Sequence, residues 1–347
     1  MSGEVDIRAR RRARRADALP ALVVIIDTEE EFDWARPISR DNRAVTSIAG
    51  QARAQAIFAR YGIVPTYVVD YPVATDADAV ATLRAFQDAG EALIGAHLHP
   101  WVTPPETEAV TPANSYPGNL PPALEEAKLR TLTDAIAASF GRRPRIYKAG
   151  RYGIGPNTPA ILARLGYRVD ASVVPHTEFC ADGGPDFRHE RPVPRAFDRD
   201  GEVMELPLSV GFCGLLRPWG PALYPPATRG PMMRLRLPGI LARTRLLERI
   251  RLSPEGADAA DHIRLTRALV ADGVRVFSYT YHSPSLVPGH TPYVRTARAL
   301  DAFLDRMDRY FDWFFGTLGG RATTPLAVRE RWEREGHAEA SAGAPGV

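Results

Sequence analysis

The sequence predicts an α/β protein in which the strands of a parallel sheet alternate with helices. Seven apolar runs of strand length recur along the 347 residues, and segments with helical periodicity separate them. Leucine, valine and isoleucine dominate the first run, at 21–27, as in a strand buried on both faces of a parallel sheet. A parallel (β/α) barrel and an open, doubly wound sheet both fit this alternation. In either architecture, functional side chains belong at the carboxyl ends of the strands.

The expected elements follow one another in a regular order. Strands are expected at 21–27, 64–69, 92–97, 144–148, 168–173, 203–208 and 274–279, and helices at 46–61, 76–89, 122–140, 157–165, 258–272 and 294–315. Prolines precede the helix at 122–140 and Gly141 follows it, which is ordinary helix punctuation.

The main domain is expected to span 20–320, with less regular segments at both ends. Residues 1–19 carry six arginines and are expected to be a disordered leader. This leader has no apolar core of the kind that a secretory signal contains, which favours a cytoplasmic protein. Residues 321–347 are rich in glycine, alanine and glutamate and are expected to be a flexible tail.

Two segments interrupt the alternation inside the main domain. Residues 100–121 contain six prolines and follow a candidate strand directly, as expected of an ordered loop beside a site. Residues 214–256 form an insertion rich in arginine and proline. Within it, 232–252 is interpreted as an amphipathic basic helix broken at Pro238. Such a helix either packs against the domain or contacts an anionic substrate or a membrane surface.

The composition limits the possible function classes. A formal net charge of +3 gives no argument for a nucleic-acid partner. No segment approaches the ~18–20 apolar residues that a membrane-spanning helix needs. Two cysteines, Cys180 and Cys213, are too few for a disulfide framework. Only Lys128 and Lys148 among the 44 basic residues are lysines, which is interpreted as a bias of composition.

The first strand ends in a cluster of carboxylates. Asp27 closes the strand, and Glu29 lies two residues further on, so that an extended backbone points both side chains to the same side. One carboxylate can then bind a metal while the other acts as a general base. Glu29 could instead be the partner of an arginine, and Glu30 and Glu31 could be solvated or cap the next turn.

Two histidines follow the third strand. His97 and His99 come immediately before Pro100 and Trp101, at a spacing that lets both imidazoles face one cation. Two imidazoles with one carboxylate match zinc or another divalent transition metal. The sequence therefore predicts a metal site formed by His97, His99 and Glu29.

Further candidates lie at the ends of later strands. Arg151 and Tyr152 follow the fourth strand within the sequence KAGRYGIGP, which lacks the spacing of a phosphate-binding loop, so Arg151 is expected to orient a carboxylate. Asp170 closes the fifth strand. His282 closes the last, and a strand-end histidine supported by a carboxylate is a natural general acid.

Taken in order, five short segments resemble the polysaccharide deacetylase family, which is carbohydrate esterase family 4 with the NodB-homology domain. The segments are IIDTEEEFDW, IGAHLHPW, AGRYG, DASVVP and YHSPSL, over roughly 20–315. The resemblance is closest to the WalW-like branch, which is linked to lipopolysaccharide or exopolysaccharide biosynthesis. It implies a single domain with a distorted (β/α)7 barrel.

The resemblance also implies roles for the candidate residues. A divalent metal, expected to be zinc, would be held by Glu29, His97 and His99. Asp27 would be the base, held by Arg151; the backbone N–H of Tyr152 would stabilise the oxyanion, and His282, tuned by Asp170, would protonate the leaving group. Trp34 and Trp101 flank this site and are expected to stack on a sugar ring.

The sequence departs from the family pattern in two places. The family has adjacent aspartates in its first motif, where this chain has Asp27-Thr28-Glu29. The family's histidine pair is spaced four residues apart, which would place the second histidine at Trp101. Either His99 takes that place through a shortened loop, or the site has a single family-type imidazole.

The leading hypothesis is a metal-dependent deacetylase that acts on the N- or O-acetyl group of a bacterial surface-polysaccharide or lipopolysaccharide precursor. Its partner would be an acetylated carbohydrate. One alternative is an amidohydrolase that acts on a small amide, although that class normally carries its HxH pair after the first strand. The other is a catalytically silent carbohydrate-binding protein on the same fold, which the altered spacing motivates.

Overall fold

The computed structural model describes residues 19–198 and 200–342. All seven expected strands are present: β1 (Ala21–Thr28), β2 (Thr66–Val69), β3 (Leu93–Leu98), β4 (Ile146–Ala149), β5 (Val169–Asp170), β7 (Met204–Glu205) and β10 (Val276–His282). They pair in parallel in the order β10-β1-β2-β3-β4-β5-β7. A short strand, β6 (Arg195–Ala196), continues the sheet antiparallel to β7. The predicted α/β class is confirmed.

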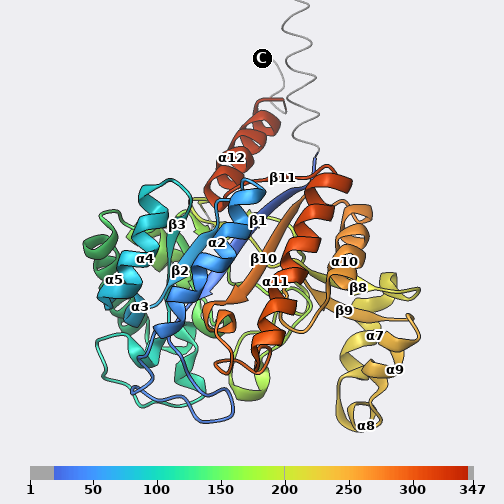
Figure 1. Cartoon of the computed structure of the whole chain (residues 1–347), viewed down its shortest axis with the longest axis horizontal. Coiled ribbons are helices and arrows are strands. Elements are labelled where there is room, and N and C mark those ends of the chain that lie inside the picture. Colours follow the sequence, from blue (N-terminus) through green and yellow to red (C-terminus); the bar gives the residue numbers. More distant parts are fainter. Residues whose placement is uncertain (1–18, 199, 343–347) are drawn as a thin grey trace, which may run out of the picture.

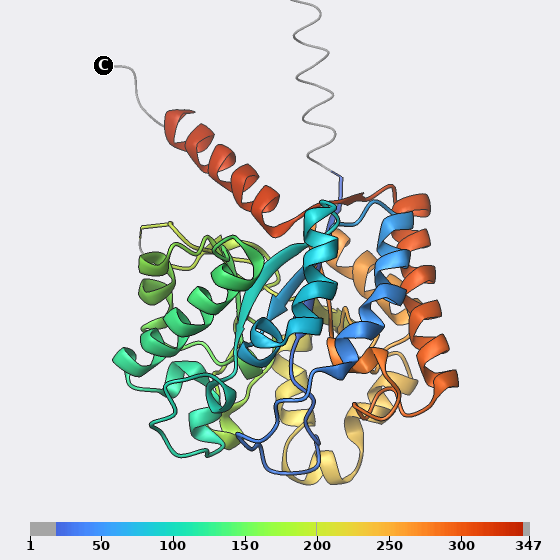
Figure 2. The same cartoon turned by 60° about the vertical axis from the view of Figure 1, so that its left-hand side comes forward.

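The sheet curls into a half-barrel (Figures 1 and 2). It stays open because β10 at one edge does not pair with β7 and β6 at the other. Two coil segments bridge this opening: the Leu252 N–H donates to the Ser209 carbonyl at 2.9 Å, and the Thr280 N–H of β10 donates to the Leu252 carbonyl at 3.3 Å. The predicted (β/α)7 barrel is therefore distorted in the sense that its sheet does not close. On its other side β10 pairs in parallel with β1, which places Asp27 of β1 opposite His282 of β10.

Helices surround the outer face of the curled sheet (Figure 1). They are α2 (Gln51–Arg60), α3 (Tyr71–Thr75), α4 (Ala77–Asp88), α5 (Pro122–Phe140), α6 (Thr158–Leu165), α10 (Ala259–Ala271) and α11 (Ala297–Asp312). Local chemistry sets their ends. Asp258 and Asp261 form a capping box at the start of α10, and Gly141 ends α5 in the left-handed conformation, at φ 72°. None of the helices in the described part of the chain is both long and apolar enough to cross a membrane.

The insertion forms a small lobe and not the single broken helix expected at 232–252. Strands β8 (Val210–Cys213) and β9 (Glu248–Arg251) pair antiparallel at its base, and α7 (Gly220–Ala227), α8 (Gly230–Arg234) and α9 (Leu237–Arg243) lie between them. Pro238 lies in the first turn of α9, where a missing N–H costs nothing. Residues 248–251 pair as a strand because Ile250 is buried while the arginines on either side of it find partners elsewhere.

The flexible tail expected from residue 321 is wrong for 321–342. Arg321 and Ala322 form β11, which pairs with β1, and α12 spans Pro325–Ala342 (Figure 2). Val328 is buried there, with Leu326 and Trp332 packed against the same apolar cluster as Val23. This apolar stripe explains the helix, because it covers the amino-terminal end of the sheet. The leader expected at 1–19 lies outside the described residues except for Leu19.

Both lysines of the chain are fully buried. The Lys128 ammonium on α5 donates to the carbonyls of Pro100, Thr103 and Pro105 at 2.6–2.9 Å and pairs with Glu108 at 3.0 Å. A compact ammonium with three donors fits such a cluster of carbonyls better than a planar guanidinium does. Lys128 thereby fixes the loop that follows the candidate histidines. The lysines are therefore not explained by composition alone.

Candidate active site

One pocket lies at the carboxyl ends of β1, β3, β4 and β10. It encloses about 470 Å³. Charged and imidazole side chains line its floor: Asp27, Glu29, His97, His99, Arg251 and His282. Aromatic side chains line its walls: Phe32, Trp34, Trp101, Tyr116, Tyr152, Phe179 and Tyr293. A polar floor with aromatic walls is typical of a site for a small polar ligand.

Glu29, His97 and His99 converge inside this pocket. Their potential ligand atoms all lie within 4.8 Å of one another. The Glu29 Oε2 atom lies 3.4 Å from His97 Nε2 and 3.5 Å from His99 Nε2, and all three side chains are buried. The two-residue spacing of the histidines therefore brings both imidazoles to one point. The geometry favours His99 as the second imidazole ligand, although the family spacing would place that ligand at Trp101.

Hydrogen bonds at the other ring nitrogen orient both imidazoles. His97 Nδ1 donates to the Lys148 carbonyl at 2.8 Å, and His99 Nδ1 donates to Glu30 Oε2 at 2.7 Å. Both Nε2 atoms are thus left to face Glu29 with their lone pairs. Burial, together with the neighbouring charge of His97, lowers the pKa of His99 to about 4. A neutral imidazole is the form that binds a metal.

Close approach of β4 to β3 shapes this corner of the pocket. A Cβ atom on Gly150 would overlap the His99 ring and the Leu98 carbonyl. Only glycine leaves room for the imidazole here. Glu29 Oε1 is buried and has no hydrogen-bond partner among the described residues. A buried carboxylate oxygen without a partner, beside two imidazole lone pairs, is the donor set that a cation would satisfy.

Two other groups of metal-ligating side chains are less suitable. Glu30 and Asp70 lie near His99, but Glu30 accepts bonds from His99 and Trp101 at 2.7 Å, and Asp70 accepts the N–H groups of Glu30 and Val73. Glu178, Cys180 and Asp186 are at least partly exposed. Arginines pair with both acids of that second group.

Asp27 is held by Lys148 of β4. The Lys148 ammonium donates to both Asp27 carboxylate oxygens, at 2.6 and 2.8 Å, and to Thr280 Oγ1 at 2.9 Å. Burial acts to raise the pKa of Asp27, but the charge of Lys148 and the nearby imidazoles of His97 and His282 outweigh it, so that the pKa is lowered. Asp27 is therefore ionised at neutral pH.

Arg151 does not take the place expected of it beside Asp27. Arg151 and Tyr152 both adopt left-handed backbone conformations, at φ 52° and 60°, and the Arg151 side chain turns toward the loop that follows β3. It binds Ser115 of that loop and Asp182 of the segment after β5, and it covers the ring of Tyr116 at 4.3 Å. It still lines the pocket, but as part of the rim.

His282 is supported by Glu255 and not by Asp170. His282 Nδ1 donates to Glu255 Oε2 at 2.7 Å, and His282 Nε2 lies 3.6 Å from Asp27 Oδ2. Burial acts to lower the pKa of His282, but the Glu255 and Glu29 charges outweigh it, so that the pKa lies well above its ordinary value. Asp170 instead accepts the Ser172 hydroxyl at 2.7 Å on β5. Four strands separate β5 from β10 in the sheet order, which explains the error.

The two tryptophans differ in their availability to a ligand. Trp34 is 38% exposed and meets the His282 ring edge-on at a centroid distance of 5.1 Å. Trp101 is buried, stacks on His99 at 4.2 Å and donates its indole N–H to Glu30 at 2.7 Å. Trp34 remains a candidate for stacking on a ligand. The contacts of Trp101 show how it supports His99.

The sequence analysis assigned no role in the site to four further residues: Lys148, Glu255, Arg251 and Glu30. Lys148 had a usable signal, because a lysine in a buried strand of an arginine-rich chain requires a specific partner. Arg251 on β9 donates to the Tyr152 hydroxyl at 2.9 Å, and neither it nor Glu255 lies at the end of an expected strand. Nothing in the local pattern singled them out.

Fold and site together define the class: an α/β protein whose curled parallel sheet carries, at its carboxyl end, a candidate metal-binding group beside the carboxylate of Asp27 and the imidazole of His282. No family model and no curated protein matches the sequence significantly. Solved structures share the fold. A protein from Mycobacterium smegmatis described as a putative polysaccharide deacetylase is 19% identical, with a TM-score of 0.51 over 94% of this chain and 92% of that one. The PuuE allantoinase is 14% identical, with a TM-score of 0.52 over 90% of each chain.

Proposed function

We propose that this chain is a metal-dependent hydrolase that removes an N- or O-acetyl group from a carbohydrate. One observation carries the proposal: a single pocket holds the Glu29–His97–His99 group together with Asp27 and His282. A metal-ligand set, an ionised carboxylate and a protonated imidazole are the groups that hydrolysis of an amide or ester requires. The likeness in fold to a polysaccharide deacetylase supports a sugar as the carrier of the acetyl group.

The residues present fit a divalent transition metal, with zinc as the first candidate. Two imidazoles and one carboxylate supply three ligands and leave open positions, as in catalytic zinc sites. Glu30 completes the set as the carboxylate behind His99. A metal bound there would supply Lewis-acid polarisation of the acetyl carbonyl and a more acidic water.

The chain's own residues would handle the protons. Asp27, held ionised and oriented by Lys148, would take a proton from the attacking water as its oxygen bonds to the acetyl carbon. His282, kept protonated by Glu255, would give its Nε2 proton to the leaving amine or alkoxide as the bond to the acetyl carbon breaks. The Tyr152 backbone N–H stays our candidate for the oxyanion. The products are acetate and the free sugar amine or alcohol.

The aromatic walls suit a pyranose ring, with Trp34 as the exposed stacking surface. We retain three finer proposals. The substrate is a bacterial surface-polysaccharide or lipopolysaccharide precursor, the chain belongs to the WalW-like branch, and its compartment is the cytoplasm. A small amide is a second candidate substrate, because the allantoinase has the same fold over 90% of each chain.

The direct test is acetate release from a panel of acetylated sugars, with a set of small cyclic amides alongside. Wild-type protein loaded with zinc, cobalt or nickel is expected to release acetate, and a chelator is expected to stop the release. Release that persists after the metal is removed would contradict metal dependence. Turnover of amides alone would select the second candidate, and binding of sugars without any turnover would select a catalytically silent protein.

Glu30→Gln is expected to weaken metal binding by about 10–100-fold, because the carboxylate behind a ligating imidazole orients it and raises its basicity. Glutamine can still accept the His99 N–H through its carbonyl oxygen, but its NH2 group then faces the Trp101 N–H, so denaturant unfolding is measured alongside to separate a loss of metal affinity from a loss of stability. Zinc titration followed by calorimetry measures the effect. Glu31→Gln is the matched control, because Glu31 accepts bonds from Thr46 and Ser47 and contacts none of the proposed ligands. An equal effect of both substitutions would argue against the role of Glu30.

Glu255→Gln is expected to narrow the pH range of activity from the alkaline side. Glu255 raises the pKa of His282, so that the protonated acid persists to higher pH. In the wild-type protein, activity falls as the pH rises through the raised pKa of His282. Neutralising Glu255 lowers this pKa, so the alkaline fall in activity begins at a lower pH. The pH profile of kcat/KM measures the shift. An unmoved alkaline limb would remove His282 from the role of acid.

A further inference from the structure

The lobe of residues 214–247 has an unusual surface. Seven of the eleven large apolar side chains that the described residues expose lie within it. The most exposed are Leu215 at 78%, Leu235 at 66% and Trp219 at 59%. Isolated apolar side chains are normal on a protein surface, but a concentration of this kind in one small lobe indicates a binding surface.

The charge of the same lobe has one sign. Residues 214–247 contain six arginines and no aspartate, glutamate or lysine. Arg217 and Arg229 pair with Asp272 and Glu178 at the base of the lobe. Arg234 and Arg243, both exposed, form no ion pair with any carboxylate of the described residues, and the same holds for the two other arginines of the lobe. The outer part of the lobe therefore offers unpaired guanidinium groups among exposed apolar side chains.

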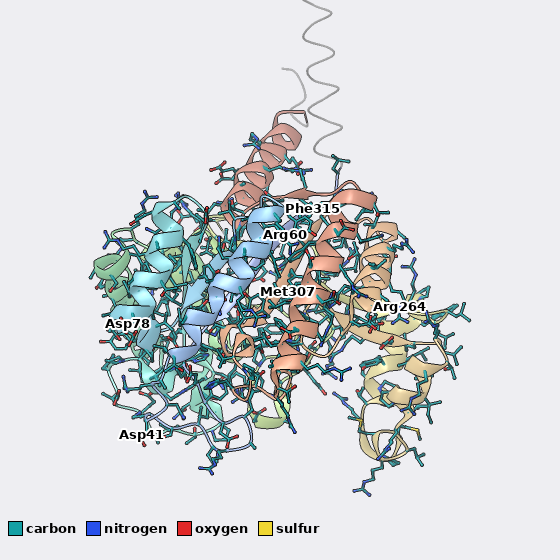
Figure 3. The ribbon with its side chains drawn as sticks, in the orientation of Figure 1. Asp41, Arg60, Asp78, Arg264, Met307 and Phe315 are labelled. Carbon is teal, nitrogen blue, oxygen red and sulfur yellow. The ribbon has the colours of Figure 1, made fainter. Side chains whose placement is uncertain are left out.

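The lobe is fixed to the domain at its base. Arg264 of α10 pairs with Glu248 of β9 and with Asp261 (Figure 3). Arg249 donates to the His176 carbonyl and to Thr177, next to the segment that carries Phe179 of the pocket wall. Figures 1 and 2 both show α7, α8 and α9 extending from the carboxyl end of the sheet, away from α12. The surface thus lies on the same end of the domain as the pocket.

We propose that this lobe binds the surface of an anionic lipid bilayer, inserting its exposed apolar side chains among the lipids while its arginines contact the phosphate headgroups. Leucine, methionine and tryptophan beside unpaired arginines are the composition of interfacial membrane anchors. A second copy of this lobe would bring like charges together without any acid to neutralise them. A nucleic acid would match the arginines but would leave the apolar side chains in water.

Vesicle sedimentation with the full chain tests this proposal. Wild-type protein is expected to bind vesicles of phosphatidylcholine mixed with phosphatidylglycerol, to leave vesicles of phosphatidylcholine alone largely unbound, and to dissociate as salt is added. Arg234→Gln with Arg243→Gln is expected to weaken binding about thirty-fold, since each basic residue near such a surface contributes about a fivefold change in affinity. Met233→Ser with Leu235→Ser is expected to weaken binding at least about tenfold.

Arg142→Gln with Arg145→Gln is the matched control. These exposed arginines precede β4, at the opposite end of the sheet, and their removal changes the net charge by the same amount. Binding that falls equally in this control would show nonspecific charge attraction and would overturn the proposal. Unchanged binding in both lobe variants would place the contact elsewhere and would also overturn it. The proposal would also be overturned if the wild-type protein failed to bind anionic vesicles, or if it bound a nucleic acid or an acidic protein and not the vesicles. Acetate release from a water-soluble sugar is expected to stay unchanged in all these variants, which separates this proposal from the proposed function.

Discussion

Replacing Lys148 by methionine is expected to lower the free energy of unfolding by about 3–5 kcal/mol, because it leaves the buried Asp27 carboxylate without its cation. Both Asp27 oxygens accept from this ammonium in the wild-type protein. Without it, the pKa of Asp27 rises. Activity, which needs the ionised carboxylate, is then lost at a higher pH as the solution is acidified. Denaturant unfolding and the pH profile of acetate release measure the two effects.

A double-mutant cycle with Asp27→Asn supplies the control for Lys148→Met. The double variant removes both charges, so it is expected to be more stable than the sum of the two single losses predicts, by about 1–3 kcal/mol. The same pair gives a pH signature. Because the folded pKa of Asp27 is lowered below 3.8, the stability that the pair contributes is present above that value and is lost as the pH falls through the lowered pKa. Strictly additive losses would contradict the proposed pairing.

His97→Ala and His99→Ala are each expected to reduce acetate release by about a thousandfold, which corresponds to the several kcal/mol that a bound metal contributes to stabilising a transition state. Each substitution removes one of three ligands from the group around Glu29. Metal content, measured on the purified variants, is expected to fall together with activity. A variant that loses activity but keeps one metal per chain would contradict the ligand assignment.

His189→Ala is the matched control for these two variants. His189 is exposed and belongs to none of the candidate metal-binding groups of the described residues. Its substitution is expected to leave metal content and acetate release unchanged. Loss of metal from this variant would show that an exposed histidine, and not the buried group, binds the ion that is measured.

Strand positions could be predicted from the sequence because each buried strand is a short apolar run bounded by turns or polar residues. The run at 21–27 became β1, and the other six runs became strands in the same order. The β8–β9 pair was missed because its second strand alternates apolar residues with arginines, whose partners lie far away in the sequence. Arg251, for instance, contacts Tyr152 across the pocket. Such partners appear only once the chain has folded.

The residue types of the site were more predictable than their pairings. Asp27, Glu29, His97, His99 and His282 all line one pocket, as strand-end reasoning anticipated. The cation beside Asp27 was misassigned because local sequence offers both Lys148 and Arg151, and only the register decides between them. Lys148 pairs with His97 across β3 and β4, whereas Arg151 lies beyond the end of β4. Asp170 was wrongly paired with His282 because the strand order is not visible in the sequence, and four strands separate β5 from β10 in the sheet.

X-ray absorption at the zinc edge of zinc-loaded protein tests the central claim most directly. We expect one zinc per chain with two imidazole nitrogens and oxygen ligands at about 2.0–2.2 Å, and loss of one imidazole in His99→Ala. A sulfur ligand at about 2.3 Å would contradict it, because neither Cys180 nor Cys213 belongs to the Glu29–His97–His99 group. A spectrum without bound imidazole would contradict it equally.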